Sequence, residues 1–220
     1  MGHRSVVIVA GGSRASRAPT GLAPDALVIA ADSGVDHAYA IGLHVDVAIG
    51  DFDSITAAGL RRAESEGARI ERHPAAKDKT DLELALDEAM RLGAADVAVL
   101  GVGGGRLDHL LANVLLLAAS AFAECRITAF DGPARVHVVH GGQAPTLFSA
   151  EAGELLTLLP VGGPASGITT SGLRFPLRDE SLASGSSRGV SNVVDTAPAT
   201  VQLATGTLLA IFPGQGDIDA

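Results

Sequence analysis

The chain is poor in aromatic and in basic residues. It has no Trp and one Tyr, and aromatic side chains make up 3% of its 220 residues. Proteins that bind single-stranded nucleic acid stack its bases on exposed rings, so this function is disfavoured. The 16 Lys and Arg residues form no run and are outnumbered by 25 Asp and Glu residues, which gives a net charge of −9. We therefore expect no nucleic-acid partner.

The chain also lacks a second cysteine and a long apolar run. Cys125 is the only cysteine, which excludes an internal disulfide and fits a reducing compartment. The apolar run Val6–Ala10 is too short for the core of a signal peptide. The longest apolar stretch, Leu110–Ala123, is interrupted by Asn113 and Ser120 and falls short of a membrane span. We expect a cytoplasmic protein that does not bind membranes.

Apolar runs alternate with helical patterns in the first part of the chain. Most of the runs are continuous, as is typical of strands buried on both faces of a parallel sheet. The predicted strands are Val6–Ala10, Ala26–Ala31, Val45–Ile49, Ala68–Arg72, Val97–Gly101 and Arg126–Phe130. The predicted helices are Val35–Ile41, Thr56–Glu66, Thr80–Leu92 and Leu107–Ala123. This alternation predicts an α/β domain with an open, mostly parallel sheet.

Helical spacing disappears after about Gly132. Short β-like runs follow, separated by Gly, Pro and Ser, and they predict a small all-β domain. These runs are Arg135–Val139, Glu154–Leu159, Gly167–Thr170, Val201–Ala204 and Leu208–Phe212. We place the α/β domain at residues 1–140 and the all-β domain at residues 141–220.

Acidic residues follow the predicted strands of the α/β domain. Because ligands bind at the carboxyl ends of strands in open α/β sheets, we expect these residues to share one edge. They are Asp32, the pair Asp51 and Asp53, the pair Asp78 and Asp81, and Asp108. An Asp-x-Asp pair in a turn can direct two carboxylates at one hard cation such as Mg²⁺.

Groups that suit phosphate occur beside these carboxylates. Gly103–Gly105 precedes a predicted helix and offers free backbone N–H groups. Lys77 and Arg106 can neutralise phosphate charge. An acidic protein can bind ATP in this way when a divalent cation bridges its carboxylates to the phosphates. Together these residues predict a magnesium–phosphate site.

Each feature also has a simpler explanation when it is taken alone. Asp81 can serve only the N-terminus of a helix, where Thr80 and Glu83 form a capping-box pattern. The chain contains no P-loop, and Gly101-x-Gly103 does not complete a dinucleotide-binding fingerprint. The convergence of several Asp-containing turns on one edge is what favours the functional interpretation.

Six motifs in order resemble those of the thiamine pyrophosphokinase family, over nearly the whole chain. Four belong to the first domain: Ala31–Asp36, Gly50–Ser54, Lys77–Asp81, and Gly104–His109 with Asn113. Two belong to the second domain: Gly172–Leu177 and Gly189–Asn192. The resemblance implies an α/β ATP-binding catalytic domain, a β-sandwich domain that binds thiamine, and a homodimer with active sites at its interface. The implied reaction transfers the pyrophosphate of ATP to the hydroxyl of thiamine and releases AMP.

The resemblance also implies roles for individual residues. Catalysis would involve Asp53, Asp81 and Arg106, and Mg²⁺ would be held by Asp51, Asp53 and Asp81. ATP and its phosphates would be bound by Asp32, Lys77, Asp78, Thr80, Gly104, Arg106 and Asp108. Thiamine would be bound by Phe175, Ser191 and Asn192.

The chain departs from the family pattern at three positions. Ser33 stands where Gly is frequent, Phe175 where Trp or Tyr is common, and Val193 where an acidic residue often follows Ser-Asn. The ring of Phe175 is expected either to stack on thiamine or to lie in the sandwich core. Two alternative functions stay open: a pyrophosphokinase acting on another hydroxymethyl heterocycle such as a pterin, and a nucleotide- or thiamine-binding regulatory module without turnover.

Overall fold

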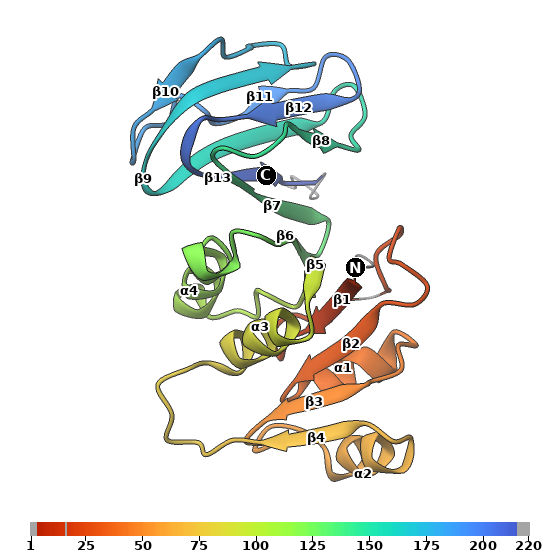
Figure 1. Ribbon diagram of the computed structural model, residues 1–220. Coiled ribbons are helices and arrows are strands. Elements are labelled where there is room, and N and C mark those ends of the chain that lie inside the picture. Colours follow the sequence, from red (N-terminus) through yellow and green to blue (C-terminus); the bar gives the residue numbers. More distant parts are fainter. Residues whose placement is uncertain (1–3, 16, 215–220) are drawn as a thin grey trace. The chain divides into compact units, whose positions relative to one another are not determined.

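A computed structural model describes residues 4–15 and 17–214 of the chain (Figure 1). The chain divides into two compact units, the first ending at Gly132 and the second beginning at Pro133. The domain boundary predicted between residues 140 and 141 falls at the end of the first strand of the second unit. Among the described residues, no helix is both long and apolar enough to cross a membrane.

The first unit is built on a parallel sheet with the strand order β4-β3-β2-β1-β5-β6. Every neighbouring pair in it is parallel. The strands are β1 Arg4–Val9, β2 Leu27–Ala31, β3 Val47–Gly50, β4 Arg69–Arg72, β5 Ala94–Leu100 and β6 Arg126–Asp131. The central residues of β1, β2 and β3 are almost fully buried, as the continuous apolar runs predict, whereas the edge strand β4 is only partly buried. Strands β2 to β4 are added on one side of β1, and β5 and β6 on its other side. The strand order therefore switches between β1 and β5, and the crevice between the carboxyl ends of these two strands is the expected ligand site.

Helices cover both faces of this sheet (Figure 1). They are α1 Gly34–Ala40, α2 Ala57–Ser65, α3 Asp81–Arg91 and α4 Leu107–Leu117. The hydroxyl of Thr80 accepts a hydrogen bond from the Glu83 N–H at 3.2 Å, which caps α3 as the sequence pattern predicts. Helix α4 is shorter than predicted: it ends at Leu117, and a 3₁₀ turn over Ser120–Phe122 leads into β6.

The second unit consists of antiparallel strands. They are β7 Ala134–His140, β8 Thr146–Phe148, β9 Leu155–Ser171, β10 Glu180–Leu182, β11 Asn192–Val193, β12 Ala199–Gln202 and β13 Thr205–Phe212. The long strand β9 joins two layers, because its first half pairs with β13 and β11 and its second half with β12 and β10. Both halves contribute buried side chains to one apolar core.

The structure therefore confirms the predicted fold class. An α/β unit with a parallel sheet is followed by a small all-β unit. Two strands predicted separately, Glu154–Leu159 and Gly167–Thr170, are parts of the single strand β9.

Candidate active site

A cleft of about 680 Å³ lies at the carboxyl edge of the parallel sheet in the first unit. The loops after β1, β2, β3, β4 and β5 form its walls, together with the N-terminal halves of α3 and α4. The lining includes most of the residues predicted for the phosphate side of the site: Asp32, Asp51, Lys77, Thr80, Asp81, Gly104, Arg106 and Asp108. The expectation that these motifs share one sheet edge is thus met in the structure.

Glycines allow two loops of the cleft to approach each other. The Ser13 N–H donates to the Gly103 carbonyl at 2.7 Å, which joins the loop after β1 to the loop after β5. A Cβ on Gly12 would lie 1.7 Å from the Gly103 oxygen, so only glycine fits there. Main-chain groups, rather than bulky side chains, therefore form this wall of the cleft, as a phosphate cradle requires.

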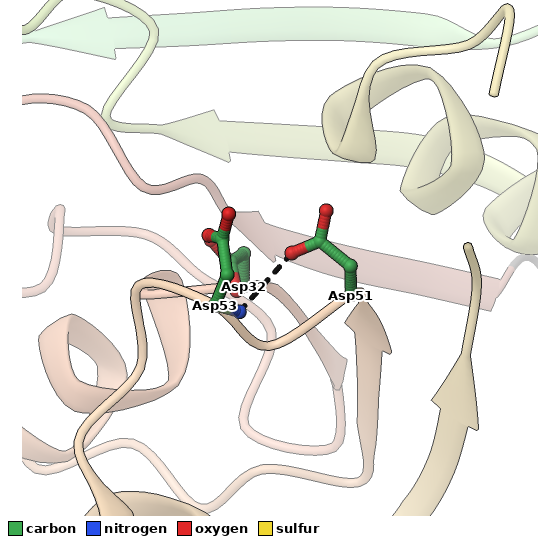
Figure 2. Close-up of side chains that lie close together, drawn as sticks. All are labelled: Asp32, Asp51 and Asp53. Carbon is green, nitrogen blue, oxygen red and sulfur yellow. Dashed lines mark hydrogen bonds between the residues drawn. The ribbon is translucent and has the colours of Figure 1, made fainter. Parts of the chain in front are cut away.

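Three aspartates lie close together at the cleft: Asp32 and Asp51 line it, and Asp53 is exposed and is not part of the lining. Asp32, Asp51 and Asp53 each offer a carboxylate oxygen, and these oxygens lie within 4.8 Å of one another (Figure 2). Asp32 follows β2 with a positive φ of 50°, and Asp51 and Asp53 follow β3. The Asp53 N–H donates to Asp51 Oδ1 at 3.1 Å, a bond that fixes the turn. This is the only group of its kind among the described residues.

One oxygen of this group is buried without a partner. The Ser54 hydroxyl donates to Asp32 Oδ2, whereas Asp32 Oδ1 is buried and has no hydrogen bond in the described chain. A buried carboxylate oxygen without a partner is costly, and a hard cation is the partner that three converging carboxylates suit best. The residues present therefore fit a magnesium ion.

The pKa values of the Asp-x-Asp pair diverge. The pKa of Asp51 is lowered, first by the hydrogen bond from the Asp53 N–H and further by the nearby Lys77 ammonium. The pKa of Asp53 is raised, mainly by the negative charge of Asp51 and next by that of Asp32. A bound cation would relieve the repulsion that raises it.

Lys77 lies between two carboxylates of the cleft. Its Nζ atom is 3.0 Å from Asp81 Oδ1 and 3.5 Å from Asp51 Oδ2. Partial burial opposes the charged form of Lys77, but the hydrogen bonds and charges of these two aspartates raise its pKa. Asp81 thus pairs with Lys77. The resemblance implies that Asp51, Asp53 and Asp81 hold the metal, whereas the closest group of three carboxylates in the structure consists of Asp32, Asp51 and Asp53.

Arg106 and Asp108 form an exposed pair at the start of α4. Arg106 donates to both carboxylate oxygens of Asp108, at 3.2 and 2.5 Å. The Arg106 guanidinium lowers the pKa of Asp108 to about 2. Because the pair is exposed, an incoming phosphate can compete for Arg106 at little cost. Asp78 is exposed and is not part of the lining, and Arg14 and Arg17 are exposed as well.

The residues predicted for thiamine lie in the second unit. The side chain of Phe175 is 65% exposed, so its ring does not belong to the core. Asn192 begins β11, and its carboxamide is bonded to the Phe175 backbone. Ser191 precedes it with a positive φ of 59°, and its N–H donates to the Thr157 hydroxyl at 3.0 Å.

Sequence reasoning missed the contact between Ser54 and Asp32. The two residues are 22 positions apart, and only the pairing of β2 with β3 brings them together. Ser54 also lines the cleft. Its place directly after the Asp-x-Asp pair was the available signal, but that position is equally typical of a residue preceding a helix.

Two family models match the chain. Residues 21–129 match the model described as the thiamin pyrophosphokinase catalytic domain, and residues 146–208 match its vitamin B1 binding domain. The first match contains all the carboxylates of the cleft, and the second contains Phe175, Ser191 and Asn192.

Individual relatives agree with these matches. A thiamine pyrophosphokinase from Bacillus subtilis is 30% identical over 94% of this chain and 98% of its own length. The crystal structure of thiamine pyrophosphokinase from Bacillus subtilis superposes with a TM-score of 0.84 at 28% identity, covering 97% of this chain and 100% of the other. A thiamin pyrophosphokinase structure from Geobacillus thermodenitrificans gives a TM-score of 0.80 at 27% identity, covering 98% of this chain and 100% of the other.

Proposed function

The chain belongs to the thiamine pyrophosphokinase family, and we propose that its aspartate-lined cleft is where ATP reacts with thiamine. It is accordingly a transferase that uses ATP as co-substrate and yields thiamine diphosphate and AMP. The observation that supports this site best is that Asp32 and Asp51, which line a glycine-walled cleft, meet the carboxylate of Asp53. These features lie within the segment that matches the catalytic domain.

Asp51, Asp53 and Asp81 are proposed to hold Mg²⁺. Their hard carboxylate oxygens suit this ion, and the unpartnered oxygen of Asp32 makes that residue a further ligand or a close neighbour. The ion would neutralise the phosphate charge that so acidic a cleft otherwise repels. Asp53 is the residue whose repulsion by its neighbours such a cation relieves most directly.

Two cations of the cleft, Lys77 and Arg106, are proposed to bind the ATP phosphates. Lys77 and Arg106 are each bonded to carboxylates in the structure, and both line the cleft. If these two side chains exchange their carboxylate partners for phosphate oxygens, they would stabilise the negative charge that develops during pyrophosphate transfer. The remaining proposed contacts to ATP are Asp32, Asp78, Thr80, Gly104 and Asp108.

Thiamine is proposed to bind against Phe175, Ser191 and Asn192. The exposed ring of Phe175 is available for stacking, and these residues lie within the match to the vitamin B1 binding domain. The thiamine hydroxyl would attack the β-phosphorus of ATP, and AMP would leave. Asp53, Asp81 and Arg106 are the proposed catalytic residues, and a largely dissociative transition state would need little help from a general base.

We further propose a homodimer with active sites at its interface, located in the cytoplasm. The described part of the first unit carries an apolar stripe on α4, where Leu107, Leu111 and Leu115 are 68%, 54% and 56% exposed. These residues are spaced by four and share one face of the helix. An exposed apolar stripe of this kind is typical of an interface. The single, buried Cys125 is compatible with a reducing compartment.

An acceptor panel tests the proposed function. Purified protein is incubated with Mg²⁺, ATP and one alcohol at a time, including thiamine and a hydroxymethylpterin, and AMP release is measured. We expect AMP and thiamine diphosphate in equal amounts with thiamine, and no AMP above background with the pterin. AMP release with the pterin alone would support the alternative acceptor. Ligand binding without AMP release at any Mg²⁺ concentration would support a regulatory module.

A further inference from the structure

Asn192 uses both ends of its carboxamide within the protein. Its Oδ1 atom accepts from the Phe175 N–H at 3.1 Å and from the Val193 N–H at 2.8 Å. Its Nδ2 atom donates to the Phe175 carbonyl at 2.7 Å. The side chain therefore holds the backbone of Phe175 on both sides, across a separation of 17 residues.

We call this pair of hydrogen bonds between the Asn192 carboxamide and the Phe175 backbone the clamp, and neighbouring backbone contacts reinforce it. The Arg174 N–H donates to the Val193 carbonyl at 2.9 Å, and Leu173 forms a bridge with Val194. Leu173 and Val194 are 6% and 0% exposed, so this bridge lies on the apolar core. The segment that bears Phe175 is thus anchored at its base by buried side chains and at its tip by Asn192.

The ring of Phe175 has no such restraint. It is 65% exposed and makes no ring contact among the residues that the structure describes. A single exposed Phe is common in proteins. Here, however, the backbone that carries the exposed ring is held by hydrogen bonds, as is expected of a preorganised stacking surface. An aromatic face of this kind suits a flat heteroaromatic cation, which thiamine carries in its thiazolium ring.

We infer that Asn192 is a positioning residue for thiamine, which acts by holding the Phe175 peptide in place. The inference rests on the proposed function, because it takes thiamine as the ligand of Phe175. A carboxamide offers a donor and an acceptor in one plane, so it can bond the N–H and the carbonyl of Phe175 at the same time. The substitution N192D keeps the acceptor but sets a second oxygen against the Phe175 carbonyl, so it is an isosteric test of the clamp.

A single tryptophan can report on the clamp directly. The chain has no Trp, so the substitution Phe175→Trp makes the position its only indole fluorophore. N192A and N192D are then introduced into this background, and Gln202→Ala serves as a control that removes an exposed carboxamide from β12 of the same unit. Fluorescence anisotropy without ligand, quenching by thiamine, and the KM values for thiamine and ATP are measured for each full-length variant. Circular dichroism verifies that each one is folded.

The clamp predicts a specific combination of results. Both Asn192 variants lower the anisotropy without ligand and raise the KM for thiamine about five- to tenfold, which corresponds to the loss of one or two net hydrogen bonds. The KM for ATP and the behaviour of Gln202→Ala stay unchanged. Unchanged anisotropy overturns the inference, and a raised thiamine KM with unchanged anisotropy assigns Asn192 to direct contact with thiamine instead. Because the anisotropy is measured without substrate, a failure of the proposed function is recognised separately, as an absence of AMP with thiamine and ATP.

Discussion

Gly50 ends strand β3 at the point where the carboxylates of the cleft meet. Its φ of +146° favours glycine, and a Cβ there would lie 3.2 Å from Asp81 Oδ1 and 3.3 Å from Asp32 Cβ. We expect Gly50→Ala to displace these side chains and to lower kcat/KM at least about tenfold. Steady-state kinetics with thiamine and ATP test this expectation.

Gly42→Ala is the matched control for this prediction. Gly42 also has a positive φ, of +79°, but nothing lies within 4 Å of the position of its Cβ. The control therefore introduces backbone strain without crowding the cleft, and it should lower the melting temperature while activity per folded molecule is retained. Equal losses of activity in the two variants would contradict a role for Gly50 in the site.

Ser54 orients Asp32 through its hydroxyl group. Removal of this donor in Ser54→Ala leaves both carboxylate oxygens of Asp32 without a hydrogen bond from the described chain. We expect Mn²⁺, as a probe of the magnesium site, to bind about five- to tenfold more weakly in the presence of ATP. Titration calorimetry measures this affinity, and Ser54→Thr should restore it. Wild-type affinity in Ser54→Ala would show that the hydroxyl is dispensable.

The sequence predicts which residues approach the site, but not all the contacts between them. The motifs that contain Asp32, Asp51 and Asp53 were predicted to share one edge, because each follows a buried strand. In the structure Asp32 completes the closest carboxylate group, with a positive φ, whereas Asp81 pairs with Lys77. Contacts of this kind form across the fold and leave no local pattern.

At the scale of whole elements, the parallel sheet was the part most open to prediction. Its inner strands are largely buried and read as apolar runs, and its helices have regular spacing. The sequence pattern predicts two strands, Glu154–Leu159 and Gly167–Thr170, and Gly162 and Gly163 lie between them. In the structure β13 pairs with β9 on both sides of these glycines, through a shift in register between Thr205 and Thr207. Long-range pairing therefore overrides a local turn signal.

Strand β7 places a titratable side chain against the core of the second unit. His137 contacts the rings of Phe148 and Phe212, and burial lowers its pKa to about 4, with a smaller contribution from Arg135. In the unfolded chain His137 is protonated as the pH falls through about 6.5, whereas in the folded chain it is protonated only near pH 4. Folding stability contributed by neutral His137 is thus complete above about pH 6.5 and is lost as the pH falls toward 4.

The substitution His137→Gln removes this titration. We expect the free energy of unfolding of the wild type to fall by up to about 3 kcal/mol between pH 6.5 and 4 on account of this residue. The variant should be less dependent on pH over the same interval. Urea denaturation at several pH values measures both proteins, and identical pH slopes would contradict the assignment.

At the scale of the whole molecule, the apolar stripe of α4 bears on assembly. Leu111 is the middle residue of this stripe and is 54% exposed. If two chains associate through it, Leu111→Glu places a charge in an apolar interface, and we expect the dimer to dissociate. Light scattering should report twice 22.1 kDa for the wild type and a single chain for the variant.

The control for the assembly prediction introduces a glutamate on a different helix. Arg61 is exposed on α2, so Arg61→Glu adds a glutamate to a polar helix face and should leave the mass of the assembly unchanged. A dimer that persists in Leu111→Glu would assign the interface to another surface. A wild type that scatters as a single chain would contradict the dimer itself.

In the proposed reaction, the aspartates at the cleft hold the metal that binds ATP while its pyrophosphate is transferred to thiamine. Asp53→Asn tests it most directly, because this substitution removes one charge from the group formed with Asp32 and Asp51 and preserves its shape. AMP formation from thiamine and Mg-ATP should fall at least about a hundredfold, while circular dichroism and the melting temperature stay close to those of the wild type. Asp25→Asn, at an exposed loop position outside the cleft, should keep wild-type activity. Wild-type rates of AMP formation in Asp53→Asn would contradict the account.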